Sequence, residues 1–211
     1  MTALLVGSTL LVGSTAAGRG SVTGAAAAGL LNGPLLWYLN RGTGVVLVAL
    51  LTGSCVLGVL ATVRAGGPHW PRFATQALHR NLSLLATALL GLHLVTAVVD
   101  TYVDIRWWET VLPFLGTYQP FWLGLGAVAF DLIAAVVVTS LFRHRMNHRR
   151  WRVIHLASYL AWAIGIVHGI GIGTDTTTRW GAGVSVASVG AVTAAVVVRL
   201  STWAHERRLV A

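Results

Sequence analysis

Four histidines lie in two apolar segments of the chain and form two pairs of nearly equal spacing. His79 and His93 are fourteen residues apart, and His155 and His168 are thirteen residues apart, with one further apolar segment between the pairs. A neutral imidazole is a common metal ligand, and an ionisable side chain in hydrocarbon is costly and rarely without a function. The pattern therefore predicts metal binding, or else a polar partner for each ring.

The composition indicates that these segments lie in a membrane. Hydrophobic residues make up 55% of the 211 residues, charged residues only 10%, and the mean hydropathy is +0.74. A helix needs about 20 consecutive apolar residues to cross the hydrocarbon layer. We therefore expect an all-α integral membrane helix bundle with five clear transmembrane helices. The expected spans are Gly44–Val63, Ala77–Val99, Phe121–Phe142, Val153–Ile172 and Gly181–Trp203.

Composition also divides the chain into three parts. Residues 1–33 form a low-complexity segment rich in Gly, Ala, Ser and Thr, for which a weak sixth transmembrane helix is one alternative. Residues 34–205 form the expected membrane domain, and residues 206–211 a basic tail. The opening segment lacks the positive start of a secretory signal, so we do not expect it to be cleaved.

All fifteen basic residues are arginine, and their distribution predicts the orientation of the chain. Eleven of them lie at one end of the expected spans: Arg64, Arg72, Arg80, Arg143, Arg145, Arg149, Arg150, Arg152, Arg199, Arg207 and Arg208. The positive-inside rule makes this end cytoplasmic, which predicts a multi-pass protein of the inner (plasma) membrane with a cytoplasmic C-terminus. Orientation explains the net charge of +9, so we expect contact with anionic lipid and no nucleic-acid partner.

The helix directions pair the histidines across the bundle. The second and fourth spans run the same way, so His79 lies at the depth of His155 and His93 at the depth of His168. At about 1.5 Å per residue the two depths are about 20 Å apart, which suits two stacked haems. Bis-histidine ligation leaves no open iron position and therefore favours electron transfer. The alternative is four interior histidines that are each satisfied by hydrogen bonds.

The thirteen-residue interval fits this scheme less well than the fourteen-residue one. On an ideal helix His79 and His93 lie within about 40° of one face, whereas His155 and His168 lie about 140° apart. A π-type bulge or local unwinding near Gly165, or haem planes turned differently, would each reconcile the interval with two haems.

These residues resemble a known family. The run His79-Arg80-Asn81-Leu82-Ser83-Leu84-Leu85 and the two histidine pairs look like the ferric reductase-like transmembrane domain. That family includes the membrane halves of NADPH oxidases and metalloreductases, and haem subunits of bacterial methionine sulfoxide reductase systems. The resemblance covers about Leu36–Trp203. It implies two b-type haems, a cytoplasmic-side one on His79 and His155 and an outer one on His93 and His168, with electrons moving outward.

The same comparison defines the partners that we expect. The chain has no soluble domain and no Gly-rich phosphate loop, which predicts no FAD or NAD site of its own. The donor is then a separate flavoprotein or a membrane quinol, and the acceptor lies at the outer face. One alternative is a haem relay subunit of a larger membrane oxidoreductase. Another is a haem-free transporter or channel in which the histidines carry protons or metal.

Arginine is suited to bidentate pairing with haem propionates, although lipid contact is an equal alternative for each candidate. The candidates are Arg72, Arg80 and Arg152 for the inner haem, and Arg41, Arg106 and Arg179 for the outer one. Asp131, in the middle of a span, is a candidate for proton handling, with a protonated acid in a helix contact as the alternative. Asp175, in the loop after His168, could meet a cationic acceptor or simply end a helix. Cys55 is expected to be a packing residue.

Overall fold

The computed structural model describes residues 34–62 and 71–210. Their secondary structure is entirely helical. The long helices are α2 (Pro34–Thr62), α3 (Arg72–Val99), α4 (Pro120–Leu141), α5 (His148–Ile172) and α6 (Arg179–Val210), and two short 3-10 helices are η1 (Trp107–Thr110) and η2 (Arg143–Arg145). The N-terminal segment, with its alternative sixth span, lies outside the described residues.

All five expected spans are confirmed as helices in the described residues, although α4 ends at Leu141, one residue before the expected Phe142, and Val63 lies outside the described residues. Within the described residues, five helices are long enough and apolar enough to cross a membrane. Large apolar side chains point outward along them; Leu84, for example, is 57% exposed and Val186 is 71% exposed. An outward apolar surface of this kind suits lipid rather than water. The chain is therefore an all-α membrane helix bundle.

Local sequence explains where two of the helices begin. Pro120 occupies the first turn of α4, where its missing N–H costs no hydrogen bond. The side chain of Asn147 caps α5 by accepting a hydrogen bond from the backbone N–H of Arg149 at 2.9 Å. The short turn around η2 joins α4 to α5, so these two helices form an antiparallel hairpin.

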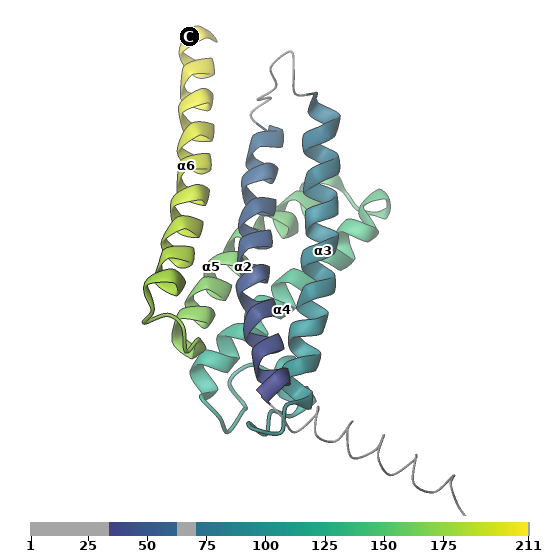
Figure 1. Ribbon diagram of the computed structural model, residues 1–211. Helices are drawn as coiled ribbons and strands as arrows, with labels where there is room; N and C mark the ends of the chain where they lie inside the picture. The colour runs from purple at the N-terminus through teal and green to yellow at the C-terminus, as the bar shows by residue number, and fades with distance from the viewer. Residues whose placement is uncertain (1–33, 63–70, 211) are drawn as a thin grey trace, which may run out of the picture.

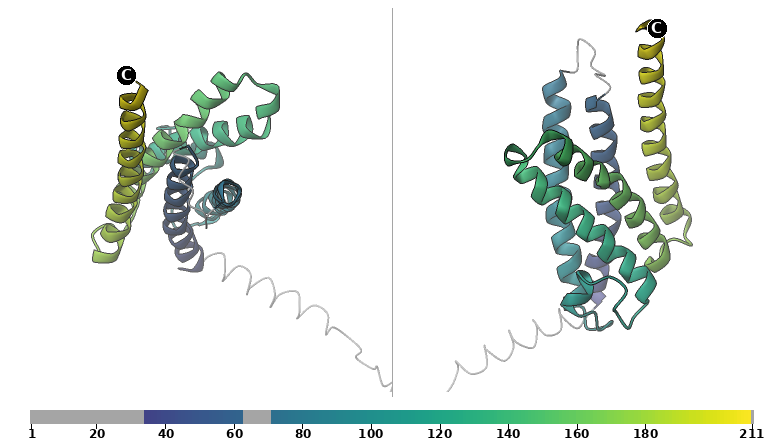
Figure 2. Two further views of the ribbon diagram at one scale, coloured as in Figure 1. Left: turned by 90° about the horizontal axis from the view of Figure 1, so that it is seen from above. Right: turned by 180° about the vertical axis from the view of Figure 1, so that it is seen from behind.

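The helices alternate in direction, as Figure 1 shows. Helices α3 and α5 run one way, and α2, α4 and α6 run the other. The closely packed pairs are α2 with α3, α4 with α5, and α2 with α6 and α5. The α4–α5 hairpin leans across α2 and α3, while α6 lies beside α2 on the side away from α3 (Figure 2). Helices α3 and α5 are not among the closely packed pairs of the described residues.

A small apolar core joins α2, α3 and α4 between the two histidine depths. Leu47, Ala86 and Leu90 are buried there, and Phe130 and Ile133 of α4 pack against them. This core fixes α3 against α2 along the stretch between His79 and His93. The rise of the continuous helix α3 sets the separation of His79 and His93, and the core sets the position of both against α2.

Helix α5 contains no bulge. It is a continuous α-helix from His148 to Ile172, so the π-type adjustment near Gly165 that the sequence suggested is absent. His155 and His168 consequently leave α5 in different directions, as a regular helix requires for a thirteen-residue interval.

Candidate functional site

Helices α3 and α5 bring the imidazole rings of His79 and His155 close together in an edge-to-face arrangement. The centroids of their imidazole rings are 6.2 Å apart and the ring planes are inclined by 73°. The rings therefore approach each other without stacking. Helices α3 and α5, which carry the two rings, are not among the closely packed pairs of the described residues.

The second pair lies toward the other end of α3 and α5. His93 contacts Asn40 of α2 and His168 contacts Trp122 of α4, near the C-terminal ends of α3 and α5. The structure thus brings His79 and His155 together and places the other two histidines at a second depth. Ser54 and Asn40 of α2 mark these depths, since each contacts one histidine of α3.

Three of the four imidazoles share one hydrogen-bonding pattern. The Nδ1–H of His79 donates to the backbone carbonyl of Ser54 at 2.9 Å, and that of His93 to the carbonyl of Asn40 at 3.0 Å. The Nδ1–H of His168 donates to the carbonyl of Trp122 at 2.8 Å. Because a carbonyl oxygen only accepts, each of these rings carries its proton on Nδ1. Their Nε2 atoms therefore keep the lone pair with which neutral histidine binds a metal.

A glycine accompanies each of the three carbonyls, four residues further along the same helix. The Cε1 atom of His93 lies 3.2 Å from where a Cβ of Gly44 would stand, and that of His79 lies 3.4 Å from a Cβ of Gly58. For His168 and Gly126 the distance is only 2.6 Å. In an α-helix the side chain at position i+4 covers the carbonyl of residue i. Glycine leaves that carbonyl open to an imidazole from the neighbouring helix.

Polar side chains of α2 support the histidines of α3 further. The Asn40 side-chain amide donates to the backbone carbonyl of His93 at 2.8 Å, so Asn40 holds His93 from both its main chain and its side chain. The Ser54 hydroxyl lies 3.3 Å from Nδ1 of His79 and 2.7 Å from the hydroxyl of Ser83. These contacts fix the depth and the rotation of both rings against α2.

His155 departs from the shared pattern. Its Nδ1 is buried and has no hydrogen-bond partner within the described residues. Its ring instead stacks on Trp151, one turn earlier in α5, with centroids 4.9 Å apart and planes inclined by 23°. The indole N–H of Trp151 in turn reaches the hydroxyl of Ser140 on α4 at 3.4 Å. His155 is thus positioned by its aromatic neighbour.

The arginines expected to bind propionates lie near the two ends of the bundle. Arg80 and Arg152 are exposed beside His79 and His155 in sequence, and Arg179 is exposed at the start of α6. Arg106 is also exposed; its guanidinium lies 5.0 Å from the ring centre of Trp108 and 3.9 Å from a carboxylate oxygen of Asp104. The side chain of Arg72 lies outside the described residues.

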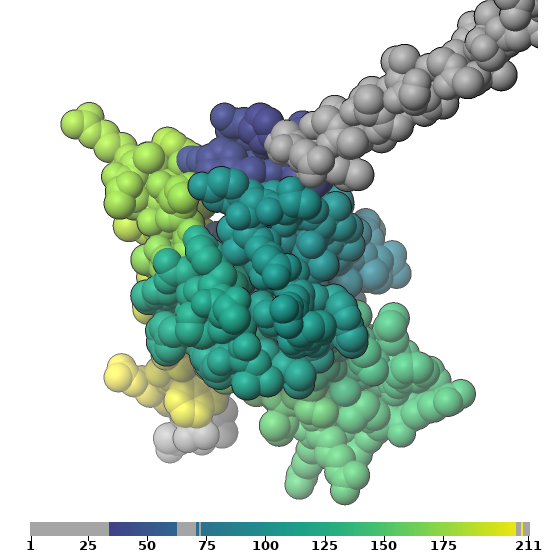
Figure 3. All heavy atoms as spheres, turned by 90° about the horizontal axis from the view of Figure 1, so that it is seen from below, coloured from purple at the N-terminus to yellow at the C-terminus, as the bar shows by residue number. Residues whose placement is uncertain are grey.

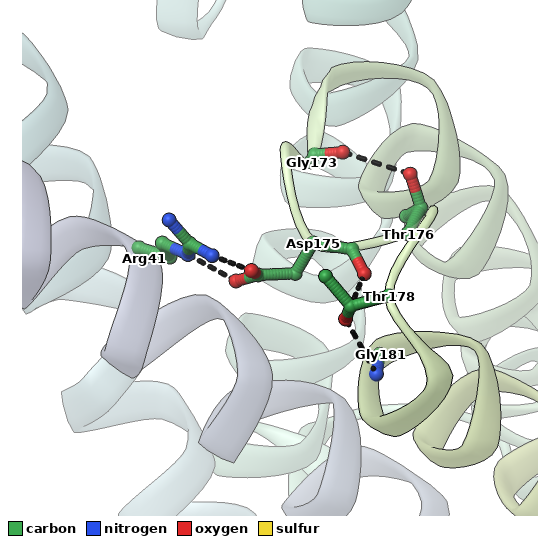
Figure 4. Close-up of polar contacts among 6 residues, drawn as sticks. All are labelled: Arg41, Gly173, Asp175, Thr176, Thr178 and Gly181. Atoms are coloured by element: carbon green, nitrogen blue, oxygen red, sulfur yellow. Dashed lines mark hydrogen bonds and ion pairs between the residues drawn. The ribbon is translucent and has the colours of Figure 1, made fainter.

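Arg41, also expected to bind a propionate, forms an ion pair with another residue of the chain. Its guanidinium forms an ion pair with Asp175, in the loop between α5 and α6, and lies 4.7 Å from the ring centre of Trp37. Figure 4 shows both contacts of the pair and the turn that carries Asp175. A hydrogen bond within the loop stabilises its turn: the hydroxyl of Thr178 donates to the carbonyl of Asp175 at 2.6 Å. The charge of Asp175 is therefore compensated by Arg41.

The segment between α3 and α4 covers much of one end of the bundle, the end at which α3 stops and α4 begins. Figure 3 views this end and shows that segment across the middle of the face, beside the start of α2. Within it, Glu109 of η1 is buried, and its Oε2 atom lacks a hydrogen-bond partner in the described residues. The segment thus forms a folded cap over the end of the bundle at which α3 ends and α4 begins.

Sequence reasoning missed several residues of the site. Trp122 was expected to be an interfacial anchor, yet its carbonyl accepts from His168, and its indole packs against Gly171 of α5. Of the glycines after His168, Gly171 is therefore the one that accommodates the indole of Trp122.

A signal for part of the missed set was present in the sequence. Asn40 and Ser54, like Gly44 and Gly58, are spaced fourteen residues apart, the same interval that separates His79 from His93. Equal intervals on two antiparallel helices indicate two equivalent contacts. Two further residues singled out in the sequence lie inside the expected helices. Asp131 is half-buried in α4, and Cys55 is buried in α2.

Each histidine pair offers two metal ligands. In the part of the chain that the structure describes, no three side chains of the His, Cys, Asp and Glu types gather around one point. Two imidazoles on opposite sides of a metal suit a cofactor that brings further ligands of its own. The arrangement can therefore hold a macrocyclic metal centre at each depth.

Comparisons with known proteins place this site within a family. A UPF0182 protein of Synechococcus sp. (strain JA-3-3Ab) is 37% identical over 95 residues, which is 42% of this chain and 11% of that protein, so the chain matches only about a tenth of the relative's length. No solved structure matches the chain. The family model for the domain of unknown function DUF8596 matches residues 35–175, a range that contains all four paired histidines and their carbonyl partners. Because this match spans more than half of the sequence, the chain belongs to the DUF8596 family.

Proposed function

We propose that this protein holds two b-type haems, one above the other between α3 and α5, and carries electrons across the membrane. His79 and His155 are the ligands at one depth, and His93 and His168 are the ligands at the other. The observation that carries the proposal is the shared hydrogen bond from Nδ1 to a backbone carbonyl. Metal-binding histidines usually donate their second N–H in this way, which fixes the tautomer and the direction of the free Nε2.

The separation of the first pair fits a metal between the rings. A metal–nitrogen bond of about 2 Å on each side, plus about 1 Å from each nitrogen to its ring centre, separates two opposed imidazole centres by about 6 Å. The centroids of His79 and His155 are 6.2 Å apart. Helices α3 and α5 are also not a closely packed pair in the described residues, as a planar cofactor between them requires.

Haem, when bound, supplies one-electron chemistry through its iron. The chain's own residues supply position and surroundings. Four imidazoles set the two depths, and the apolar core of Leu47, Ala86 and Leu90 keeps water from the stretch between them. Two histidines per iron leave no ligand position for a substrate, so the ligation favours electron transfer over chemistry at the metal.

Arginines near each depth are proposed to pair with the propionates. Arg80 and Arg152 serve the His79–His155 depth, with Arg72 as a further candidate, and Arg106 and Arg179 serve the other depth. Arg41 acts there together with Asp175, because the two already form an ion pair.

The orientation follows from charge. Most of the described arginines lie at the end that contains η2, the start of α5 and the end of α6. We place this end in the cytoplasm of a plasma membrane, with an electron donor, a flavoprotein or a quinol, on that side and an acceptor outside. The resemblance to ferric reductase-like membrane domains supports the same direction. Reporter fusions at the C-terminus, active only in the cytoplasm or only outside, test the orientation.

Haem content is the decisive measurement. Protein purified from haem-replete cells should give a Soret band, a sharp α band on reduction, and two haems per chain by the pyridine haemochrome assay. The variant His144→Ala, at an exposed histidine of η2, is the matched control and should keep both haems. A colourless wild-type preparation contradicts the proposal and favours a haem-free transporter or channel.

A further inference from the structure

One histidine of the four lacks the hydrogen bond that the other three share, and this distinguishes the His79–His155 pair from the His93–His168 pair. Both rings of the second pair donate Nδ1–H to a carbonyl, at 3.0 and 2.8 Å. In the first pair only His79 does so, while Nδ1 of His155 is buried without a partner in the described residues. The two pairs are therefore chemically unequal although they contain the same residue types.

The inequality has a geometric cause in the spacing along each helix. Fourteen residues return to nearly the same face, so both histidines of α3 reach carbonyls of α2. Thirteen residues on the regular helix α5 leave its two histidines about 140° apart. His168 therefore reaches Trp122 of α4, whereas His155 points in a different direction and meets Trp151 on its own helix.

We infer that the His79–His155 pair holds its haem at the higher reduction potential and the His93–His168 pair holds its haem at the lower one. The inference rests on the proposed function. A histidine that donates its second N–H is a more basic ligand and stabilises the oxidised metal more strongly. Second-shell hydrogen bonding is one of the means by which a protein sets a haem potential. The first pair has one such donor ring and the second pair has two.

Trp151 is the residue that keeps His155 in this state. A long side chain on a helix leans back over the preceding turn, so the ring of His155 covers the position four residues earlier. That position carries an indole, which offers a flat apolar face at 4.9 Å and no acceptor in the ring plane. Trp151 is thus a positioning residue, and an acceptor in its place should reach Nδ1 of His155.

The hydrogen-bond asymmetry itself can be measured without any cofactor. Nitrogen-15 NMR of histidine-labelled protein in lipid bilayers, haem-free, should show three strongly hydrogen-bonded Nδ1–H groups among the paired histidines and one that is not. The variant His155→Ala should remove the odd signal. Four equivalent signals would overturn the inference.

The consequence for potential is measured by optical redox titration. His168→Ala should leave only the His79–His155 haem, and His79→Ala only the His93–His168 haem, and the first should titrate at the higher potential. Trp151→Gln supplies an acceptor to His155 and should lower the potential of that haem toward the other. The matched variant Trp151→Phe keeps a stacked ring without an acceptor and should leave the potential near the wild-type value.

The outcomes separate this inference from the proposed function. Two haems with equal potentials, or equal shifts in Trp151→Gln and Trp151→Phe, overturn the inference and leave electron transfer standing. A colourless protein overturns both. If Trp151→Gln does not fold, the potentials of the two single-pair variants still decide the question.

Discussion

The two histidine depths of this protein use the same side chains but are built differently. At the His93–His168 depth both rings are hydrogen-bonded to carbonyls of neighbouring helices, and an ion pair between Arg41 and Asp175 ties α2 to the adjacent loop. At the His79–His155 depth one ring is held by α2 and the other by an aromatic stack. The difference shows that the spacing of the histidines along each helix decides which neighbour each imidazole meets.

The largest expected effect is the loss of the haem at one depth while the haem at the other depth stays bound. His168→Ala should lower the haem content from two per chain to one, because the remaining ring of that pair cannot supply bis-histidine ligation, while the His79–His155 pair is untouched. The pyridine haemochrome assay measures the ratio. Retention of two haems in this variant would contradict the assignment of the pairs.

The ion pair at the His93–His168 end gives the next effect. Arg41→Ala leaves the carboxylate of Asp175, whose side chain is only 9% exposed, without its cation. Because the Arg41 side chain is 31% exposed, the pair is only partly buried, and leaving the carboxylate unpaired costs about 1–3 kcal/mol in free energy of unfolding. Thermal unfolding in detergent should show the drop, with the haem at this end lost first.

Asp104→Ala is the control for that experiment. The pairing of Asp104 with Arg106 spans 3.9 Å, and both side chains are more than half exposed. Exposed pairs contribute little to stability, so the melting temperature should hardly change. Equal losses from the two variants would mean that the Arg41–Asp175 pair does not brace this end.

A smaller effect tests the glycine beside each carbonyl. In Gly126→Ala the new Cβ would stand 2.6 Å from Cε1 of His168, so the ring must move, at a cost of about 1–3 kcal/mol in stability. Haem affinity at this depth should fall, by about 10- to 100-fold where the second-shell bond is lost. Haem-transfer titration to apomyoglobin measures the affinity.

The same substitution elsewhere provides a graded series. Gly58→Ala should have a weaker effect because its Cβ would stand 3.4 Å from His79, and Gly165→Ala should have little effect because nothing lies within 4 Å. An order of effects unrelated to these distances would show that the glycines do not act by giving the rings access.

The smallest effect distinguishes the contribution of the Ser54 hydroxyl from that of the Ser54 carbonyl to the orientation of His79. Ser54→Ala removes the hydroxyl that lies 3.3 Å from Nδ1 of His79 but keeps the carbonyl at 2.9 Å. We expect a loss of about 0.5–1.5 kcal/mol in stability and an unchanged haem content. Loss of the haem would show that the hydroxyl, and not the main chain, orients this ring.

Much of the fold followed from hydropathy alone. The apolar runs predicted all five helices, and the paired depths followed from the direction of α3 and α5. The ends of the helices did not, because polar residues such as Asn147 begin a helix through a capping contact rather than through hydropathy. The π-type bulge near Gly165, one of the alternatives for the thirteen-residue interval, is absent, because α5 stays regular and its two histidines take different neighbours.

The sequence by itself determined the membrane bundle, the interval between the histidines and the separation of charge between the two ends. These are properties of a single helix and of its transfer into lipid, so they need no knowledge of neighbours. Only the tertiary structure decided which carbonyl each imidazole meets. That choice depends on the rotation of one helix against another and on a glycine at the contact, which is why His168 is bonded to α4 and His155 is left to Trp151.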